Sequence, residues 1–397
     1  MAVVASGRDG NSRSVHSLLY NPAFRQFVYQ GLTLVFIIWL FWFAGTNAAQ
    51  NLARANMTAG FEFLRNRAGF DIAQTPIAYS SDNTYLQALT VGLVNTLIIA
   101  VSGIITASII GLIVGIGRLS HNWLISRLAT VYVEIFRNIP PLLVIFFWYK
   151  GVLSLLPEVR SALALPLSVF VSNRGIYMPA PVFGEGIGLV VAAFVAAIVA
   201  AILYSRWATK RQLATGKRPP VLWTNIALIV GLPLVVFVVL GAPVTFDIPE
   251  LGKFNMRGGT VIGPEFLSLY MALSFYTAAF IAEIVRAGIR GVSKGQTEAA
   301  SALGLRSGPT TRLVVLPQAL RIIIPPLTSQ YLNLTKNSSL AVAIGYADLV
   351  AVGGTILNQS GHSIEIIAIW MLIYVSISLA TSLFMNWFNA KMALVER

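Results

Sequence analysis

The chain has 397 residues, of which 56% are hydrophobic and only 11% charged, and its mean hydropathy is +0.74. A soluble domain carries about 25% charged residues, so this composition excludes a soluble protein and indicates a polytopic membrane protein within a lipid bilayer. The net charge of +13 does not indicate a partner nucleic acid, because the basic residues stand in short clusters beside apolar runs. The chain has no cysteine and its three histidines lie far apart, so neither disulfides nor a metal site is expected.

Apolar runs long enough to cross a bilayer recur along the chain. A spanning helix needs about 20 mostly apolar residues, and about eight runs meet this requirement. In chain order, the expected spans are 27–45, 86–116, 130–154, 187–204, 221–242, 264–285, 326–346 and 364–388. The seventh run is the least typical, because it contains Lys336 and several polar residues.

Charges in the loops predict the orientation. If the N-terminus is inside, every short inner loop is basic, including 206–218 and 286–321, whereas the outer loops are longer and also contain acidic residues. Basic residues favour the cytoplasmic side of membrane proteins. Both termini are therefore expected in the cytoplasm, which agrees with an even number of spans.

Small residues mark helix faces that allow close packing. Gly103, Ala107, Gly111 and Gly115 recur every four residues in the second expected span. Such a face allows another backbone to approach closely. Packing within one chain is favoured over a subunit interface, although a small-residue face serves both.

A polar passage interrupts the apolar pattern between the sixth and seventh spans. Ser293 and Gln296 have the spacing of a capping box, which predicts a helix from about Lys294, and Gly304 is suited to a left-handed C-terminal cap. The turn residues 307–309 predict a second helix, which Pro317 ends or kinks. On physical grounds the passage is either a docking element for a partner protein or an ordinary cytoplasmic loop that contains a helix.

The same passage resembles a known motif. Glu298-Ala299-Ala300, Gly304 six residues after the glutamate, and Leu316-Pro317 are similar to the "EAA" loop of ABC importer permeases. Residues 282–289, 295–300, 316–319 and 334–340 look like the polar amino acid permeases, and 95–97, 118–120 and 132–143 fit the first half of that family. The resemblance covers about 86–150 and 265–390.

The resemblance implies a fold and a division of labour. The expected fold is an all-α type I ABC importer permease (MetI-like) core, and the coupling residues would be Glu298, Ala299, Ala300, Gly304, Leu316 and Pro317. The implied partners are an ABC ATPase dimer, a second, different but related permease, and a periplasmic amino-acid-binding protein. The implied substrate is an L-amino acid carried across a bacterial inner membrane. The chain has no G-x-x-x-x-G-K-[ST] phosphate loop, so it is not expected to be an enzyme or to bind a cofactor, and ATP and Mg²⁺ would bind to the ATPase.

The chain departs from the usual family pattern in its long middle. Two added spans and long loops resemble the subgroup that transports general L-amino acids, or glutamate, glutamine, aspartate and asparagine. The expected segments are an N-terminal cytoplasmic segment (1–26), the first span with a long periplasmic loop (27–85), the first part of the core (86–150), an insertion (151–263), the second part of the core (264–390) with its coupling loop at about 286–325, and a cytoplasmic tail (391–397).

Polar residues at membrane depth are candidates for solute contact, because they are expensive there. The candidate substrate path consists of Asn333, Lys336, Asn337, Ser338 and Ser339. For these five residues, hydrogen bonding between helices within the protein is as well supported as a role in the solute path. Asn95 and Thr96 are further candidates, whereas Glu134, Arg137 and Glu283 lie near cytoplasmic ends of spans, where contact with water or ion pairing is favoured over a role in solute contact.

One alternative comes from another functional class. A secondary transporter driven by an ion gradient would show inverted repeats with matching broken helices. Only residues 139–142 and 324–327 recur, which is too short a match to indicate a repeat. A membrane-bound enzyme is disfavoured, because no nucleophile or metal constellation stands out.

Overall fold

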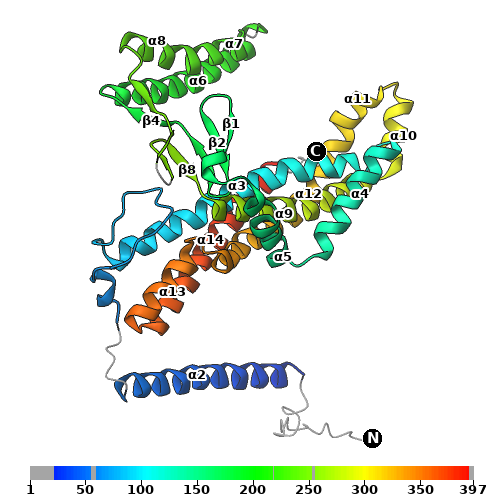
Figure 1. The fold of residues 1–397 in the computed structure, drawn as a ribbon. Helices are drawn as coiled ribbons and strands as arrows, with labels where there is room; N and C mark the ends of the chain where they lie inside the picture. The colour runs from blue at the N-terminus through cyan, green and yellow to red at the C-terminus, as the bar shows by residue number, and fades with distance from the viewer. Residues whose placement is uncertain (1–21, 55–59, 218, 253–254, 393–397) are drawn as a thin grey trace, which may run out of the picture.

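The computed structural model describes residues 22–54, 60–217, 219–252 and 255–392, and these are mostly helical (Figure 1). Six described helices are long and apolar enough to cross a membrane, or up to eight spans result if each of two bent helix pairs forms one span. These six lie in α2 (Pro22–Arg54), α3 (Tyr85–Gly117), α6 (Ile187–Thr215), the helical run Val221–Val239, α9 (Pro264–Arg290) and α14 (Ser363–Met392), while α12 (Leu316–Asn337) belongs to one of the bent pairs. This result agrees with about eight predicted spans.

The centre of the fold is the packing of α3 against α9. A Cβ atom added at Gly111 would lie 2.6 Å from the Ile281 Cβ, and one added at Gly115 would lie 2.8 Å from the Ala282 carbonyl oxygen. Only glycine allows these two backbones to approach so closely. The small-residue face of α3 therefore packs within the chain, as predicted. On the other side of α3, Ile109 and Ile113 are exposed, as expected for a face that contacts lipid.

The third expected span is wrong as a single helix. The structure has α4 (Trp123–Asn138) and then α5 (Pro141–Phe146), which continues through a π turn (Phe147–Val152) and a short 3₁₀ turn (Leu153–Leu155). The two parts meet at an angle of 111°. Pro140 disfavours a helical conformation of the residue before it, and Ile139 is accordingly extended (φ −103°, ψ 133°).

The seventh expected span begins earlier than predicted. Helix α12 starts at Leu316, and Pro325 and Pro326 lie inside it rather than at its entry. Pro317 neither ends nor sharply kinks a helix. Instead a π turn (Thr311–Val315) joins the short helix α11 (Ser307–Thr310) to α12. A proline ring clashes with the carbonyl four residues earlier, and a wider turn at this point relieves that clash.

After α12 the chain forms a 3₁₀ helix (Ser338–Ile344) and then α13 (Leu349–Ser360), with a bend of 52° between the two parts of this pair. The predicted continuous span 326–346 therefore ends as a tighter helix. Asn95 and Thr96 of α3 hold this bend in place: the Asn95 side chain donates to the Ala347 carbonyl (2.8 Å), and the Thr96 hydroxyl accepts from the Leu349 N–H (3.0 Å). Both side chains are buried, and these bonds tie α3 to the bend.

The inserted region contains a helical hairpin at the two predicted added spans, and β structure that was not predicted. Helix α6 packs against α7 (Val221–Ile226), a π turn (Ala227–Gly231) and α8 (Leu232–Val239), and this hairpin stands apart from the main bundle (Figure 1). A two-stranded antiparallel ribbon of β4 (Ala180–Phe183) and β5 (Val244–Asp247) connects the hairpin to the rest of the molecule. A small two-stranded sheet of β6 (Glu250–Leu251) and β7 (Met256–Arg257) follows.

A four-stranded antiparallel sheet joins the insertion to the core. Its strand order is β1 (Leu163–Leu165), β2 (Val169–Ser172), β3 (Gly175–Met178) and β8 (Thr260–Ile262), with Tyr177 of β3 opposite Val261 of β8. Strand β8 leads through Gly263 directly into α9. The sheet is therefore fixed to the end of α9 that is remote from the polar passage.

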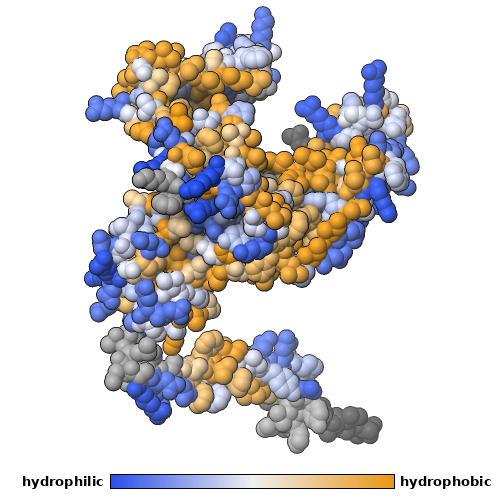
Figure 2. Space-filling view, viewed as in Figure 1, coloured by the Kyte–Doolittle hydropathy of each residue, from blue (hydrophilic) through white to orange (hydrophobic). Residues whose placement is uncertain are grey.

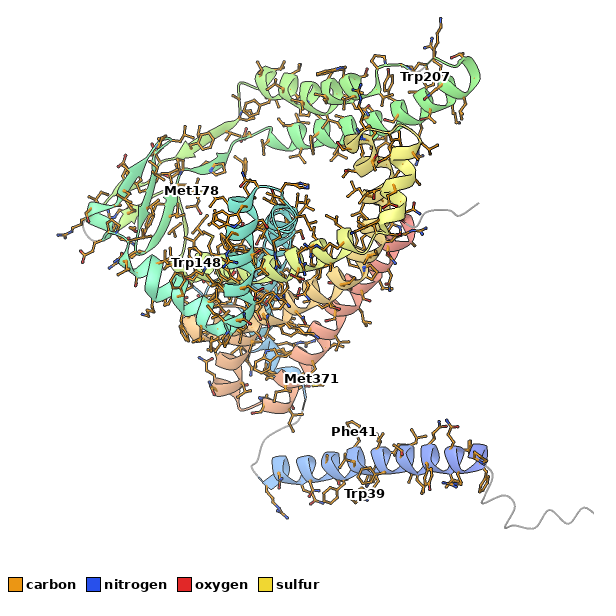
Figure 3. All side chains as sticks on the ribbon, turned by 90° about the vertical axis from the view of Figure 1, so that its right-hand side faces the viewer. Trp39, Phe41, Trp148, Met178, Trp207 and Met371 are labelled. Carbon is orange, nitrogen blue, oxygen red and sulfur yellow. The ribbon has the colours of Figure 1, made fainter. Side chains whose placement is uncertain are left out.

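Helix α2 lies apart from the other helices (Figure 1). Trp39 and Phe41 point to opposite sides of it (Figure 3), so apolar side chains lie on both sides of its middle part. Apolar surface also covers much of the main bundle, while polar residues gather at its ends (Figure 2). A surface of this kind requires a membrane or partner helices around it.

Candidate functional site

The polar passage forms a projecting turn of two short helices. Helix α10 (Lys294–Ala302) follows α9, and with α11 it lies at the far end of the bundle (Figure 1). Gly304 has a φ of +78° and ends the helix as predicted. The Leu305 N–H donates to the Ala300 carbonyl (3.1 Å) and the Gly304 N–H to the Ser301 carbonyl (2.9 Å). These two bonds form a Schellman cap, which fixes the direction in which the chain leaves α10.

The predicted capping box is wrong. Ser293 is the N-cap residue of α10, but its side chain makes no capping hydrogen bond. The Gln296 side chain faces α12 instead, where its Oε1 accepts a hydrogen bond from Gln318 Nε2 (3.1 Å). This contact ties α10 to the beginning of α12.

The surface of α10 presents small and apolar groups on a polar loop. Glu298 and Ala299 are exposed, Ala300 is buried against the rest of the loop, and Leu303 is 82% exposed. Leu313 on the adjoining π turn is also exposed. Glu298 makes no ion pair with the described residues. The arrangement suits insertion of the helix into a groove of another protein.

A cluster of charges lies behind the projecting loop. The Glu283 carboxylate of α9 forms ion pairs with Arg118 at the end of α3 and with Arg286, and it lies 3.7 Å from an Arg137 Nη of α4. Arg118 also lies 3.9 Å from Glu134. Of the two roles expected for Glu134, Arg137 and Glu283, contact with water or ion pairing, the structure shows ion pairing. This cluster joins α3, α4 and α9.

The candidate substrate-path residues occupy the end of α12 and the following 3₁₀ helix. Asn333 and Lys336 are exposed, and Asn337 and Ser339 are half-buried. Ser338 is fully buried and donates to the Thr335 carbonyl (2.8 Å), so it does not face a path in this structure. Lys336 makes no ion pair within the part of the chain that the structure describes. The five residues thus lie together in the structure, but Ser338 is buried while the other four are exposed or half-buried.

A cavity at the opposite end of α9 was not predicted. It has a volume of about 920 Å³ and lies between the core and the inserted sheet, with Gln74, Tyr149, Arg174 and Glu265 among its lining residues. The sequence contained one weak signal, an acidic residue directly after Pro264 at the start of a span. The partners of Glu265 come from segments distant in the chain, so no local motif marks the cavity.

Membrane-length helices around a tightly packed pair, with a capped helix projecting between two of them, define a multi-pass membrane transport subunit. Residues 218–394 match the family model described as "Binding-protein-dependent transport system inner membrane component". The chain belongs to this family, and within it to the amino acid ABC transporter permeases. The predicted family is therefore confirmed.

Relatives match almost the whole chain. The general L-amino acid transport system permease protein AapQ of Rhizobium johnstonii is 64% identical over 100% of this chain and 99% of the relative. The putative amino-acid ABC transporter permease protein YhdX of Escherichia coli is 48% identical over 95% and 96%. The glutamate/glutamine/aspartate/asparagine transport system permease protein BztB of Rhodobacter capsulatus is 44% identical over 96% of each chain. These relatives support an ABC permease rather than a transporter driven by an ion gradient.

Proposed function

We propose that this chain is a membrane subunit of an importer that takes up L-amino acids across the bacterial inner membrane. The names of the relatives support this substrate class. The chain works with an ABC ATPase dimer, which binds ATP and Mg²⁺, with a second related permease, and with a periplasmic binding protein. The chain itself holds no cofactor, and its termini lie in the cytoplasm.

The observation that carries the proposal is the exposed surface of the projecting α10. In this proposal Glu298 and Ala299 contact the ATPase. Ala300 packs α10 against the rest of the loop, and Gly304 fixes the direction in which the chain leaves α10. Leu316 and Pro317 begin α12 directly after the π turn. Because Gln296 is bonded to Gln318, a displacement of α10 by the ATPase passes to α12 as well as to α9.

Reconstitution of the four components in vesicles tests the function as a whole. Labelled L-amino acids should accumulate only when ATP is supplied on the ATPase side. Glu298→Arg should leave the chain inserted in the membrane but abolish this accumulation. Uptake without ATP, driven by an imposed ion gradient, would refute the proposal.

The cap of α10 provides a second test. Gly304→Ala places a side chain at a φ of +78°, which costs about 1–2 kcal/mol, although no atom lies within 4 Å of the new Cβ. Gly308→Ala is the matched control, because its Cβ also meets open space but its backbone needs no positive φ. Gly304→Ala should lower ATPase retention and uptake, whereas Gly308→Ala should not. If the two variants retain the ATPase equally well, the left-handed conformation at Gly304 is not critical for coupling.

The solute path is proposed to include Asn333, Lys336, Asn337 and Ser339, without the buried Ser338. The exposed Lys336 ammonium supplies a positive charge for the carboxylate of an amino acid in transit. Lys336→Met keeps the chain length and removes the charge, so uptake should fall while the assembled complex remains intact. Lys210→Met, at an exposed position on α6, is the control. Loss of assembled complex, rather than loss of uptake, would assign Lys336 a structural role.

A further inference from the structure

The cavity between the core and the inserted sheet lies across the membrane from the projecting loop. Helix α9 has 27 residues and connects the two places. At a rise of about 1.5 Å per residue the helix is about 40 Å long, which exceeds the hydrocarbon core of a bilayer. The cavity volume of about 920 Å³ falls within the range of about 300–1,000 Å³ that small-molecule sites occupy.

One wall of the cavity carries a carboxylate with only neutral partners. Glu265 stands in the first turn of α9, where its Oε1 accepts a hydrogen bond from the Tyr149 hydroxyl (3.2 Å) and its Oε2 accepts one from Gln74 Nε2 (3.3 Å). Among the described residues, no cation forms an ion pair with this carboxylate. The Gln74 Oε1 atom is buried and also lacks a hydrogen-bond donor in the described chain. The Glu265 carboxylate therefore lines the cavity without a positive partner.

The inserted sheet supplies the opposite charge. Arg174 lies in the turn between β2 and β3, where its backbone N–H donates to the Ser172 Oγ (3.2 Å) and its side chain is exposed. Arg174 lines the same cavity as Glu265, yet no ion pair joins it to any acidic residue that the structure describes. A guanidinium presents several donors in a planar fork, which matches a carboxylate. Figure 3 shows the sheet that carries Met178 beside the core segment that carries Trp148.

The negative charge of Glu265 and the positive charge of Arg174 line one cavity without pairing to each other, so together they are complementary to a zwitterion. We propose that this cavity is an outer binding site for the α-amino and α-carboxylate groups of the transported amino acid. Glu265 and the Tyr149 hydroxyl hold the ammonium group, and Arg174 holds the carboxylate. These groups recognise the backbone of the amino acid and leave its side chain free, so the site accepts a broad range of substrates. The inference rests on the proposed import of amino acids and adds the place where they first contact this chain.

The test uses the complete reconstituted complex with its binding protein, and labelled L-glutamine and L-glutamate as probes. A hydrogen bond to a charged group contributes about 1.5–3 kcal/mol, so Arg174→Gln and Glu265→Gln should each raise the half-saturating concentration roughly 10- to 150-fold for both probes. Arg174→Lys should retain most of the uptake. Arg257→Gln is the matched control, because Arg257 belongs to the same insertion but does not line this cavity.

Each outcome has a distinct meaning. If the wild-type complex takes up the probes and the half-saturating concentration is unchanged in Arg174→Gln and Glu265→Gln, the proposed outer site is refuted. The proposed import function is then unaffected. A wild-type complex that accumulates neither probe would refute the proposed function itself. If Glu265→Gln reduces the yield of complex, the decision rests on Arg174. Its side chain is exposed and Arg174→Gln does not require the core to repack.

Discussion

Leu303 allows a direct test of docking, because its side chain is 82% exposed at the end of α10. Complete burial of a leucine side chain stabilises by about 1.5–3 kcal/mol. If the ATPase covers the exposed part, Leu303→Ser removes about 1.2–2.4 kcal/mol of binding free energy, which raises the Kd roughly 7- to 50-fold. The stability of the permease should not change, because the side chain has few contacts within its own chain.

The assay is a titration of the purified ATPase against the permease complex in lipid nanodiscs. Leu213→Ser serves as the control, since Leu213 is 84% exposed near the end of α6 and lies outside the coupling loop. The Leu303→Ser complex should bind the ATPase more weakly by the stated factor and transport more slowly, while the Leu213→Ser complex should match the wild type. Equal Kd values for the two variants would refute the docking of α10.

Two further predictions concern packing and orientation. Gly111→Ala should lower the free energy of unfolding by about 1–3 kcal/mol and lower the melting temperature, because the new Cβ would lie 2.6 Å from Ile281. Gly117→Ala, whose new Cβ has its nearest contact at 3.6 Å, should leave the melting temperature unchanged. Equal melting temperatures for the two variants would contradict the tight α3–α9 contact. The chain has no native cysteine, so an impermeant maleimide should label Leu167→Cys in intact cells and Ser307→Cys only after the membrane is opened. Labelling of Ser307→Cys in intact cells would reverse the proposed orientation.

Local signals predicted the parts of the fold that depend on local physics. The apolar runs indicated the spans, and the small residues every four positions indicated the packing face of α3. Gly304 was predicted as a helix end because few other residues adopt a positive φ without strain. In each case the determining interaction lies within one helix turn or one helix face.

Features that depend on distant partners were not predicted. Gln296 fits a capping box in sequence, but its side chain bonds to Gln318, 22 residues away. The strands β3 and β8 pair across more than 80 residues of chain that include the helical hairpin. Glu265 becomes a candidate binding residue only through its hydrogen bonds with Tyr149 and Gln74, and neither residue is near it in sequence. Such contacts follow from tertiary packing, which single-sequence patterns do not encode.

The passage from β8 through Gly263 into α9 makes one continuous body of the inserted sheet and a helix of membrane-spanning length. The strand pairing fixes the inserted sheet to one end of this body, and α10 is attached to the other end. A tilt of α9 by about 10° would displace one end by about 7 Å relative to the other, given the helix length of about 40 Å. The helix would then act as a lever: a force applied at α10 would open or narrow the gap between the sheet and the core without any change in the fold of either part.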